Sequence, residues 1–252
     1  MPTLANRVFA AVPEGLRWRL LGLQQGLHEP EVKVVREALA LGGTALDVGG
    51  WWGPWSYRMS RHADRVVVLE PVPELAAYLE RVSPESVEVV QAAASSAPGT
   101  STLWVPSSGL GSEGRSSLAL SPPESEAVEV RLVKIDDLDL GDDLRLVKVD
   151  VEGHELEAIR GAVETLQRSH PVLVVELEQR FHEQPLAEAF AEVEALGYRG
   201  WFLDGRAWRS TDEFDVERWQ TRWEDQVATA SYFGATRYRS KFRNNFVFRP
   251  AD

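Results

Sequence analysis

Short apolar runs alternate with longer amphipathic stretches along most of this chain, and the alternation predicts strands separated by helices. The runs that indicate buried strands span residues 44–46, 63–71, 87–94, 145–150 and 171–178. Two further runs, 198–203 and 245–248, indicate strands that close the sheet. Strands and helices that alternate at this spacing are typical of a mostly parallel sheet with helices on both faces. We therefore predict an α/β fold with a seven-stranded sheet and an antiparallel edge strand.

The first 43 residues carry a different pattern. Apolar residues recur there at helical spacing, namely Phe9, Val12, Leu16, Leu20 and Leu23, and residues 31–41 resemble a second helix. Four charged residues between positions 7 and 19 interrupt them, so we expect neither a signal sequence nor a membrane span. We predict that residues 1–43 form a helical segment packed on one sheet edge, and that 44–252 form the main domain of a cytoplasmic protein. A lid or a dimer contact is the alternative role for this segment.

A second departure from the alternation lies between residues 95 and 126. This segment is rich in Ser, Gly and Pro, with strand-like pieces at 101–105 and 116–120. We interpret residues 95–126 as an irregular flap over the sheet rather than a linker. Alternating apolar and polar residues resume at 127–135 and predict a half-exposed strand.

The stretch Asp47–Ser56 places three glycines within five positions, directly after an apolar run. This order predicts a buried strand, a tight turn and a helix start. Glycines let the backbone adopt positive φ and let a ligand approach the main chain closely. Because ligands of open parallel sheets bind at the carboxyl ends of the strands, the turn is a candidate floor for a nucleotide-type cofactor. A glycine-rich turn without a ligand is the alternative interpretation.

Acidic residues follow the apolar runs. Glu70 lies 21 residues after Gly49 at the end of the next strand, where nucleotide pockets place the carboxylate that holds a ribose diol. Asp150 and Glu176 end two later strands, so we expect them at the same edge of the sheet. The run 87–94 ends in small residues, which leave room for a flat group such as adenine or for close helix packing. A solvated edge is the alternative for all these acids.

His154 follows Asp150 by four positions, in the first turn of a predicted helix. Histidine titrates near neutrality and suits a general base, and the helix dipole there favours its neutral form. The alternative is that His154 and Glu155 only satisfy backbone groups at the helix start. Asp150, Glu176 and Glu178 are a less favoured candidate site for a divalent cation. The other four histidines are interpreted as surface or capping residues.

The composition of the chain excludes several classes of binding partner and of catalytic site. The 39 acidic and 27 basic residues give a net charge of −12, and no stretch concentrates Lys and Arg, which argues against nucleic-acid binding. The chain has no cysteine, which excludes disulfides, thiolate metal sites and a cysteine nucleophile. We expect a small-molecule partner and no membrane insertion. The oligomeric state, including a homo-oligomer, is left open.

Several of these stretches together resemble the FkbM-type methyltransferases. Asp47–Ser56 is similar to the cofactor turn of that family, and Leu69–Pro73 to its ribose-binding segment. Lys134–Leu138, followed by Lys148–Glu155, resembles its most distinctive signature, and the last strand from Asn244 is also similar. One departure is Gly50-Trp51, where the family usually has Ala-Asn.

The resemblance implies a class I methyltransferase (Rossmann-like) fold that uses S-adenosylmethionine to methylate a hydroxyl of a sugar or other natural-product or cell-surface glycan acceptor. His154 is our candidate base, oriented by Asp150. The candidate cofactor-binding residues are Asp47, Gly49, Gly50, Trp51, Gly53, Ser56, Glu70, Pro71, Gln91, Ala93 and Asp150. The candidate acceptor-binding residues are Glu176, Trp52 and Trp201, since carboxylates and flat rings both bind sugars.

Two other functions compete with this interpretation. A nicotinamide-dependent oxidoreductase would also use the glycine turn and Glu70, but Trp51 and Pro54 stand where the second and third glycines of its motif belong. A cofactor-binding protein of the same fold that has lost activity is the other alternative, because tryptophan at position 51 cannot replace the hydrogen bonds of asparagine.

Overall fold

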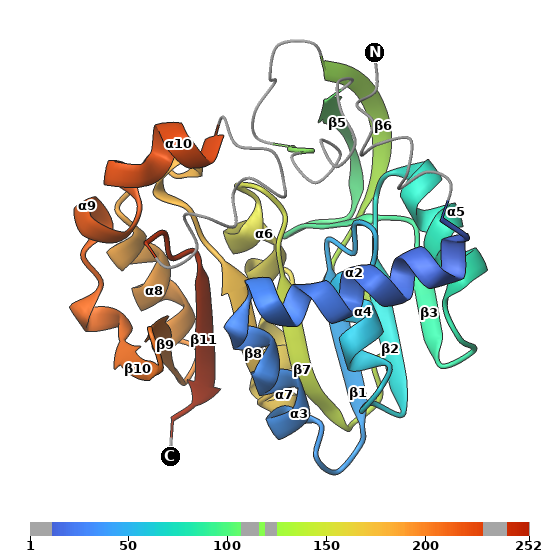
Figure 1. Cartoon of the computed structure of the whole chain (residues 1–252), viewed down its shortest axis with the longest axis horizontal. Coiled ribbons are helices and arrows are strands. Elements are labelled where there is room, and N and C mark those ends of the chain that lie inside the picture. Colours follow the sequence, from blue (N-terminus) through green and yellow to red (C-terminus); the bar gives the residue numbers. More distant parts are fainter. Residues whose placement is uncertain (1–11, 107–115, 119–124, 229–240, 252) are drawn as a thin grey trace.

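A computed structural model describes residues 12–106, 116–118, 125–228 and 241–251 of the chain (Figure 1). Its main sheet has eight strands in the order β10-β9-β11-β8-β7-β1-β2-β3. In chain order they are β1 (Thr44–Val48), β2 (Arg65–Leu69), β3 (Val87–Val90), β7 (Leu144–Val149), β8 (Val172–Glu176), β9 (Tyr198–Asp204), β10 (Ala207–Ser210) and β11 (Asn245–Pro250). The sequence therefore located seven of these strands and missed β10.

Five consecutive strands, β8-β7-β1-β2-β3, are parallel to one another, whereas β11 runs antiparallel to both β8 and β9. The predicted fold class, a mostly parallel α/β sheet with an antiparallel edge, is confirmed. The missed strand β10 pairs with β9 after a turn at Gly205, whose φ is +64°. No residue of β10 is buried, so it has no apolar run that a pattern could reveal.

Helices cover both faces of the main sheet. One face carries α2 (Glu14–His28), η1 (Pro30–Val32), α3 (Lys33–Ala38), α4 (Pro54–Met59) and α5 (Pro73–Val82). The other carries α6 (Glu155–Arg160), α7 (Val163–Ser169) and α8 (Leu186–Glu194). The remaining helical elements are η3 (Ile135–Asp137), η4 (Gln179–Phe181), η5 (Thr211–Glu213), α9 (Val216–Trp219), η6 (Thr221–Trp223) and α10 (Glu224–Ala228). Two apolar cores fill the spaces between these layers and the strands.

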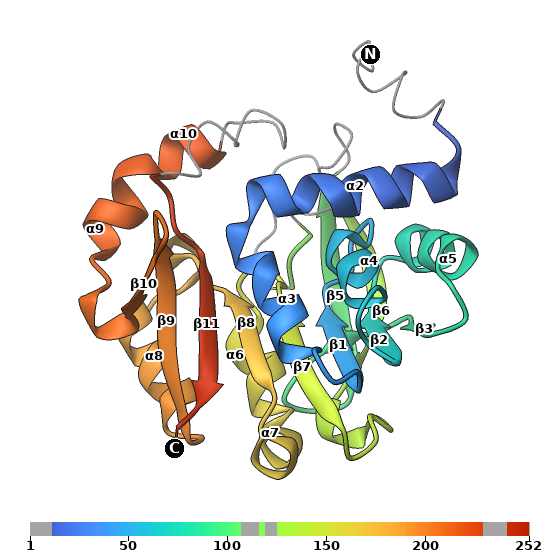
Figure 2. The same cartoon turned by 60° about the horizontal axis from the view of Figure 1, so that its bottom comes forward.

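The N-terminal helix α2 packs in the opposite orientation to the one its apolar stripe predicts. Leu16, Leu20 and Leu23 are 46–48% exposed, while Trp18 and Leu21 are buried. The reason is Gly22: a Cβ there would lie 2.1 Å from the Tyr57 ring, so glycine allows α2 to approach α4 closely. Figure 2 shows α2 running across the sheet above the carboxyl ends of the parallel strands. Phe9 lies outside the described residues.

A second, three-stranded sheet stands beside the main one. It contains β4 (Ala93–Ala94), β5 (Gly99–Pro106) and β6 (Ser125–Val133) in the order β4-β6-β5. The run 87–94, predicted as one strand, is thus divided between two sheets. The predicted flap contains β5 and the start of β6, and Ser117 bridges to Trp104. Its residues 107–115 and 119–124 lie outside the described part.

A membrane-spanning helix would need a long apolar segment. Among the helices of the described ranges, none has the length and apolar character that crossing a bilayer requires.

Candidate functional site

The three carboxylates Asp47, Glu70 and Asp150 lie at one edge of the main sheet. Asp47 is on β1, Glu70 directly follows β2, and Asp150 directly follows β7. These strands are adjacent and parallel, in the order β7-β1-β2, and Val48 of β1 is level with the last residues of both neighbours. The carboxyl ends of the strands therefore bring the three acids together, as the sequence predicted. We call this end of the sheet, where the parallel strands finish, the carboxyl edge.

The glycine turn after β1 depends on its glycines for packing. Gly49 and Gly53 have φ of +86° and +75°, which disfavours any residue with a Cβ. A Cβ on Gly49 would lie 1.9 Å from the carbonyl oxygen of Asp150, and one on Gly50 would lie 2.3 Å from Val68 Cγ1. The turn thus touches both neighbouring strands, which holds it in place at the carboxyl edge.

Trp51 has a φ of +49°, in the left-handed region that tryptophan rarely adopts. Asparagine tolerates this conformation better than most residues, which gives a backbone reason for asparagine at such a position. The Trp51 side chain packs on an apolar cluster that includes Leu75 and Ala93. Tryptophan in place of the family's usual asparagine at position 51 therefore places a large ring between the glycine turn and the three-stranded sheet.

The Glu70 carboxyl group holds the turn from the other side. Its Oε2 accepts a hydrogen bond from the Trp51 N–H at 2.7 Å, and its Oε1 accepts one from the Val72 N–H at 2.8 Å. Glu70 is 3% exposed, and burial raises its pKa to about 8. These two N–H donors leave Glu70 further hydrogen-bonding capacity, as an acceptor when it is ionised and also as an O–H donor when it is protonated, so it can still bind a ligand hydroxyl.

Asp47 is oriented by the first helix after the turn. Its carboxyl group accepts a hydrogen bond from the Ser56 hydroxyl of α4, and both residues are buried. Burial raises the pKa of Asp47 to about 7, while the Ser56 bond acts in the opposite direction. Ser56, which the sequence placed in the cofactor turn, therefore fixes the position of Asp47.

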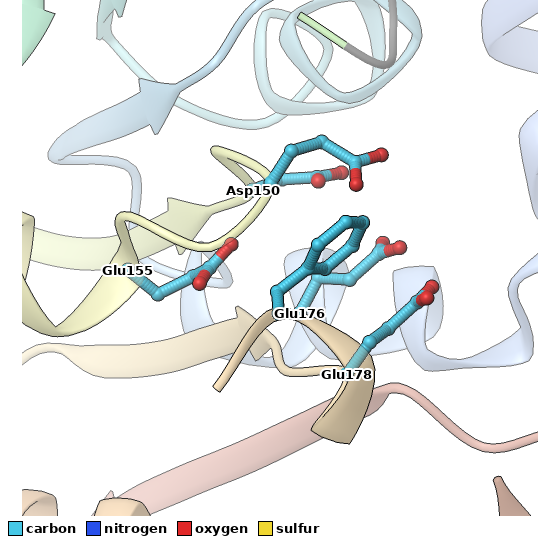
Figure 3. A pocket seen from close by; sticks show the side chains of 6 residues that line it. Asp150, Glu155, Glu176 and Glu178 are labelled. Atoms are coloured by element: carbon cyan, nitrogen blue, oxygen red, sulfur yellow. The ribbon is translucent and has the colours of Figure 1, made fainter. Parts of the chain in front are cut away.

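A small pocket opens beside Asp150 and is lined almost entirely by acids. Its lining residues are Asp150, Glu152, Glu155, Glu176, Glu178 and Phe181. Figure 3 shows the Asp150, Glu176 and Glu178 side chains pointing to the same side of this pocket. Burial raises the pKa of Glu176 and of Glu178 above the ordinary value for glutamate, and the neighbouring Asp150 charge adds to both shifts. We call this feature the acidic pocket.

Three residues that were not predicted as site residues hold these acids, namely Asn244, Lys148 and Arg180. The Asn244 amide donates to Glu176 Oε1 at 2.5 Å and to Glu178 Oε1 at 2.9 Å, and Arg180 Nε lies 2.6 Å from Glu178 Oε2. Lys148 is fully buried beside Asp150 and Glu176. One signal was available for Lys148, namely a charged residue inside an apolar strand. In the described part of the chain, no group of three or more His, Cys, Asp or Glu side chains is arranged to hold a metal ion.

His154 immediately precedes α6, and its ring faces the start of the small sheet. Its Nε2 lies 3.1 Å from the Ser95 Oγ, and burial lowers its pKa. His154 is not one of the residues that line the acidic pocket. The neighbouring Glu155 carboxylate accepts hydrogen bonds from the Gly153 N–H, so part of its role is to hold the loop. His182, interpreted as a surface or capping residue, is the C-cap residue of η4, and its side chain is largely buried, 3.4 Å from Glu155 Oε2.

The other predicted site residues lie in different surroundings. Pro71 follows Glu70 directly; Gln91 is exposed between β3 and β4, whereas Ala93 is buried. The Trp52 ring packs edge-on against Tyr78 of α5, with 4.8 Å between ring centroids. Trp201 lies on β9, which β11 separates from β8, and it does not line the acidic pocket. The structure therefore gathers most of the predicted cofactor-binding residues around the turn. The candidate acceptor-binding residue Trp201 lies apart from them.

Several of the solved structures similar to this chain are methyltransferases, at low sequence identity. A methyltransferase FkbM from Methylobacillus flagellatus is 14% identical, with a TM-score of 0.49; the match covers 96% of this chain and 57% of that one. An N-methyltransferase from Bradyrhizobium japonicum is 11% identical, with a TM-score of 0.45, over 89% of this chain and 96% of the other. A Burkholderia thailandensis 1,6-didemethyltoxoflavin N1-methyltransferase, solved with S-adenosylhomocysteine, is 12% identical, with a TM-score of 0.43, over 100% and 93%.

The comparison that identifies the chain is one of sequence. No curated protein matches it. A family model described as the methyltransferase FkbM domain matches residues 44–199, from β1 into β9. This match covers more than half of the chain, which therefore belongs to the FkbM methyltransferase family.

Proposed function

We propose that this protein is an O-methyltransferase that methylates a hydroxyl group of a sugar or other natural-product or cell-surface glycan acceptor. S-adenosylmethionine is the methyl donor of the family to which the chain belongs. The observation that carries the proposal is the meeting of Asp47, Glu70 and Asp150 at the carboxyl edge, next to the acidic pocket. The chain spans 57% of the length of the Methylobacillus flagellatus protein, so nothing further about the acceptor is taken from that relative.

The side chains at the carboxyl edge fit the chemistry of the donor. S-adenosylmethionine carries a ribose diol, a sulfonium and an ammonium group, and carboxylates can accept from hydroxyls or balance cations. In our proposal Glu70 hydrogen-bonds the ribose diol, because its two N–H donors leave it further hydrogen-bonding capacity. Asp47 and the turn Gly49–Gly53 face the methionine end, together with Asp150. Residues 91–93 flank the adenine.

In our proposal the acceptor binds against the side chains that line the acidic pocket; the pocket itself has about 150 Å³ of empty space, part of it open to solvent, and does not enclose a sugar. Glu176 ends β8 next to Asp150, and both line the pocket. A carboxylate oxygen can accept hydrogen bonds from two sugar hydroxyls at once. Trp52 and Trp201 are retained as candidate acceptor contacts. Trp52 lies beside the glycine turn, whereas Trp201 requires an acceptor long enough to reach β9.

When bound, S-adenosylmethionine supplies a methyl group that its sulfonium already activates. The residues of the chain have to hold the acceptor oxygen in line with that group, at roughly 3–3.5 Å, and to accept the hydroxyl proton. We propose that His154 Nε2 accepts the proton and that Asp150 stabilises the imidazolium that forms. Burial lowers the pKa of His154, which supports a neutral, proton-accepting ring. The ring must then exchange its contact with Ser95 for the acceptor.

Calorimetric titration with S-adenosylhomocysteine, S-adenosylmethionine and NAD(P) tests the cofactor, and a panel of glycosides and matched amines with labelled methyl donor tests the acceptor. We expect binding of both adenosyl ligands and label on hydroxyl-bearing acceptors. Binding of a nicotinamide cofactor alone, or label on amines only, refutes the proposal. Cofactor binding without transfer to any acceptor would instead favour a protein that has lost activity. The positive φ of Trp51 in the cofactor turn is the observation that supports this alternative.

A further inference from the structure

Lys148 is a cation with no access to solvent. It belongs to β7, whose other residues are mostly apolar, and its side chain is 0% exposed. Burying an ammonium group costs several kcal/mol unless it is paired and hydrogen-bonded. Burial acts to lower the pKa of Lys148, but the facing carboxylates, Asp150 first and then Glu176, raise it above its ordinary value. Lys148 is therefore charged in the folded protein.

The contacts of Lys148 come from several elements that meet at the carboxyl edge. Its Nζ lies 3.4 Å from Asp150 Oδ2 and 3.7 Å from Glu176 Oε2, and it donates to Asn245 Oδ1 at 3.2 Å. The fourth neighbour is the Trp55 ring of α4, with its centroid 5.4 Å away. Three oxygens and one aromatic ring thus surround the ammonium group.

Asp150 and Glu176 need a cation between them. Lys148 is level with Val174 of β8, so Asp150 and Glu176, each two residues further on, end neighbouring strands side by side. Two carboxylates held this close in a partly buried site repel each other. Burial and the Asp150 charge raise the pKa of Glu176 well above its ordinary value, and Lys148 acts against this shift. Without the ammonium group, the pair would hold a proton more tightly.

We propose that Lys148 is a positioning residue of the methyl-transfer site, which holds Asp150 and Glu176 side by side and offsets the repulsion between them, with Asp150 turned to the methyl donor and Glu176 to the acceptor. This inference rests on the function proposed above. Lys148 acts only through the two carboxylates and does not itself contact the reacting groups.

Other charged groups face this pair and enter its pH dependence. They are Glu29 at the end of α2, Asp47 on β1, Glu152 after β7, and Glu178 and Arg180 after β8. Four of the five are acidic, so they add to the repulsion that Lys148 offsets.

The test compares binding of two probes: sinefungin, which carries an amine where the methyl donor has its sulfonium, and S-adenosylhomocysteine, which is uncharged there. Lys148→Met keeps the length of the side chain and removes its charge. In this variant, binding of sinefungin must expel the proton that Glu176 holds more tightly. Its affinity should then fall by up to about tenfold for each unit by which the pH is lowered, a steeper fall than in the wild type.

Titration calorimetry in two buffers with different ionisation enthalpies counts that proton. We expect more proton release on sinefungin binding in Lys148→Met than in the wild type, and a smaller difference with S-adenosylhomocysteine. Lys148→Met/Glu176→Gln removes the ammonium group together with the charge of one of its two carboxylate partners, and this double variant should restore the wild-type pH profile. Lys33→Met, which removes an exposed lysine on α3, is the control and should match the wild type.

The outcomes separate this inference from the proposed function. A wild-type protein that binds neither probe overturns both. Wild-type binding with equal proton release and equal pH profiles in Lys148→Met overturns the role of Lys148 alone, which would then be structural. If Lys148→Met does not fold, a folded double variant supports the pairing, and an unfolded double variant contradicts it because the lysine would then be needed for packing.

Discussion

Replacing Glu70 by glutamine tests whether the buried carboxyl group after β2 is neutral in the folded protein. Glu70 is 3% exposed, and burial raises its pKa from the ordinary 4.5 to about 8. The folded protein therefore holds a proton that the unfolded chain has already released at the same pH. This stabilising contribution is complete below the unfolded pKa and is lost as the pH rises through the folded pKa.

The magnitude follows from the size of the Glu70 shift. One pKa unit corresponds to about 1.4 kcal/mol, so the whole window from 4.5 to about 8 corresponds to at most about 5 kcal/mol. Between about pH 5.5 and pH 8, the titration of Glu70 should lower the free energy of unfolding by about 3 kcal/mol. Glutamine cannot titrate, and its amide faces one of the two N–H donors that Glu70 now accepts from, which costs about 1–3 kcal/mol at every pH.

Thermal unfolding without cofactor, at several values between about pH 5.5 and pH 8.5, measures this difference. Glu70→Gln should be less stable than the wild type at acid pH, and the gap should close or reverse as the pH rises. For a chain of this size, each kcal/mol corresponds to about 2–4 °C in Tm. Glu74→Gln, which changes an exposed carboxylate on α5, is the matched control. Parallel stability curves for the wild type and Glu70→Gln would refute the buried neutral acid.

Three further predictions concern the turn, the base and the acidic pocket. Gly50→Ala should lower the free energy of unfolding by about 1–3 kcal/mol in urea titrations, because its Cβ meets Val68, and adding Val68→Ala should recover most of the loss. His154→Ala should slow methyl transfer to an identified acceptor by about 100-fold or more without changing S-adenosylhomocysteine affinity, and an unchanged rate removes it from the mechanism. Asn244→Asp adds a carboxylate between Glu176 and Glu178, so its Tm deficit should grow from pH 6 to pH 8; a constant deficit contradicts the repulsion.

Most of the main-sheet strands and the meeting of the acids could be predicted because both follow from local patterns. An apolar run that ends in a carboxylate specifies a buried strand and its carboxyl end, and parallel pairing then places Asp47, Glu70 and Asp150 at one edge. The α2 packing face could not be predicted this way. Its stripe of leucines marks an apolar helix face, but the glycine at position 22 decides which face reaches α4.

The acidic pocket was only partly accessible from the sequence. Asp150, Glu176 and Glu178 could be identified at strand ends, but their partners Lys148 and Asn244 could not, because a residue pattern does not report the register between β7, β8 and β11. Similarly, the position of His154 in the chain suggested a place beside Asp150. Its ring instead contacts Ser95, which directly follows the short strand β4 that the sequence had merged with β3.

A crystal structure with bound S-adenosylhomocysteine tests the central claim most directly. We predict that the ribose hydroxyls lie within about 3 Å of the Glu70 carboxyl oxygens and that the homocysteine end lies between Asp47 and Asp150. A ligand bound elsewhere, with the glycine turn and the three carboxylates making no contact to it, would contradict the account.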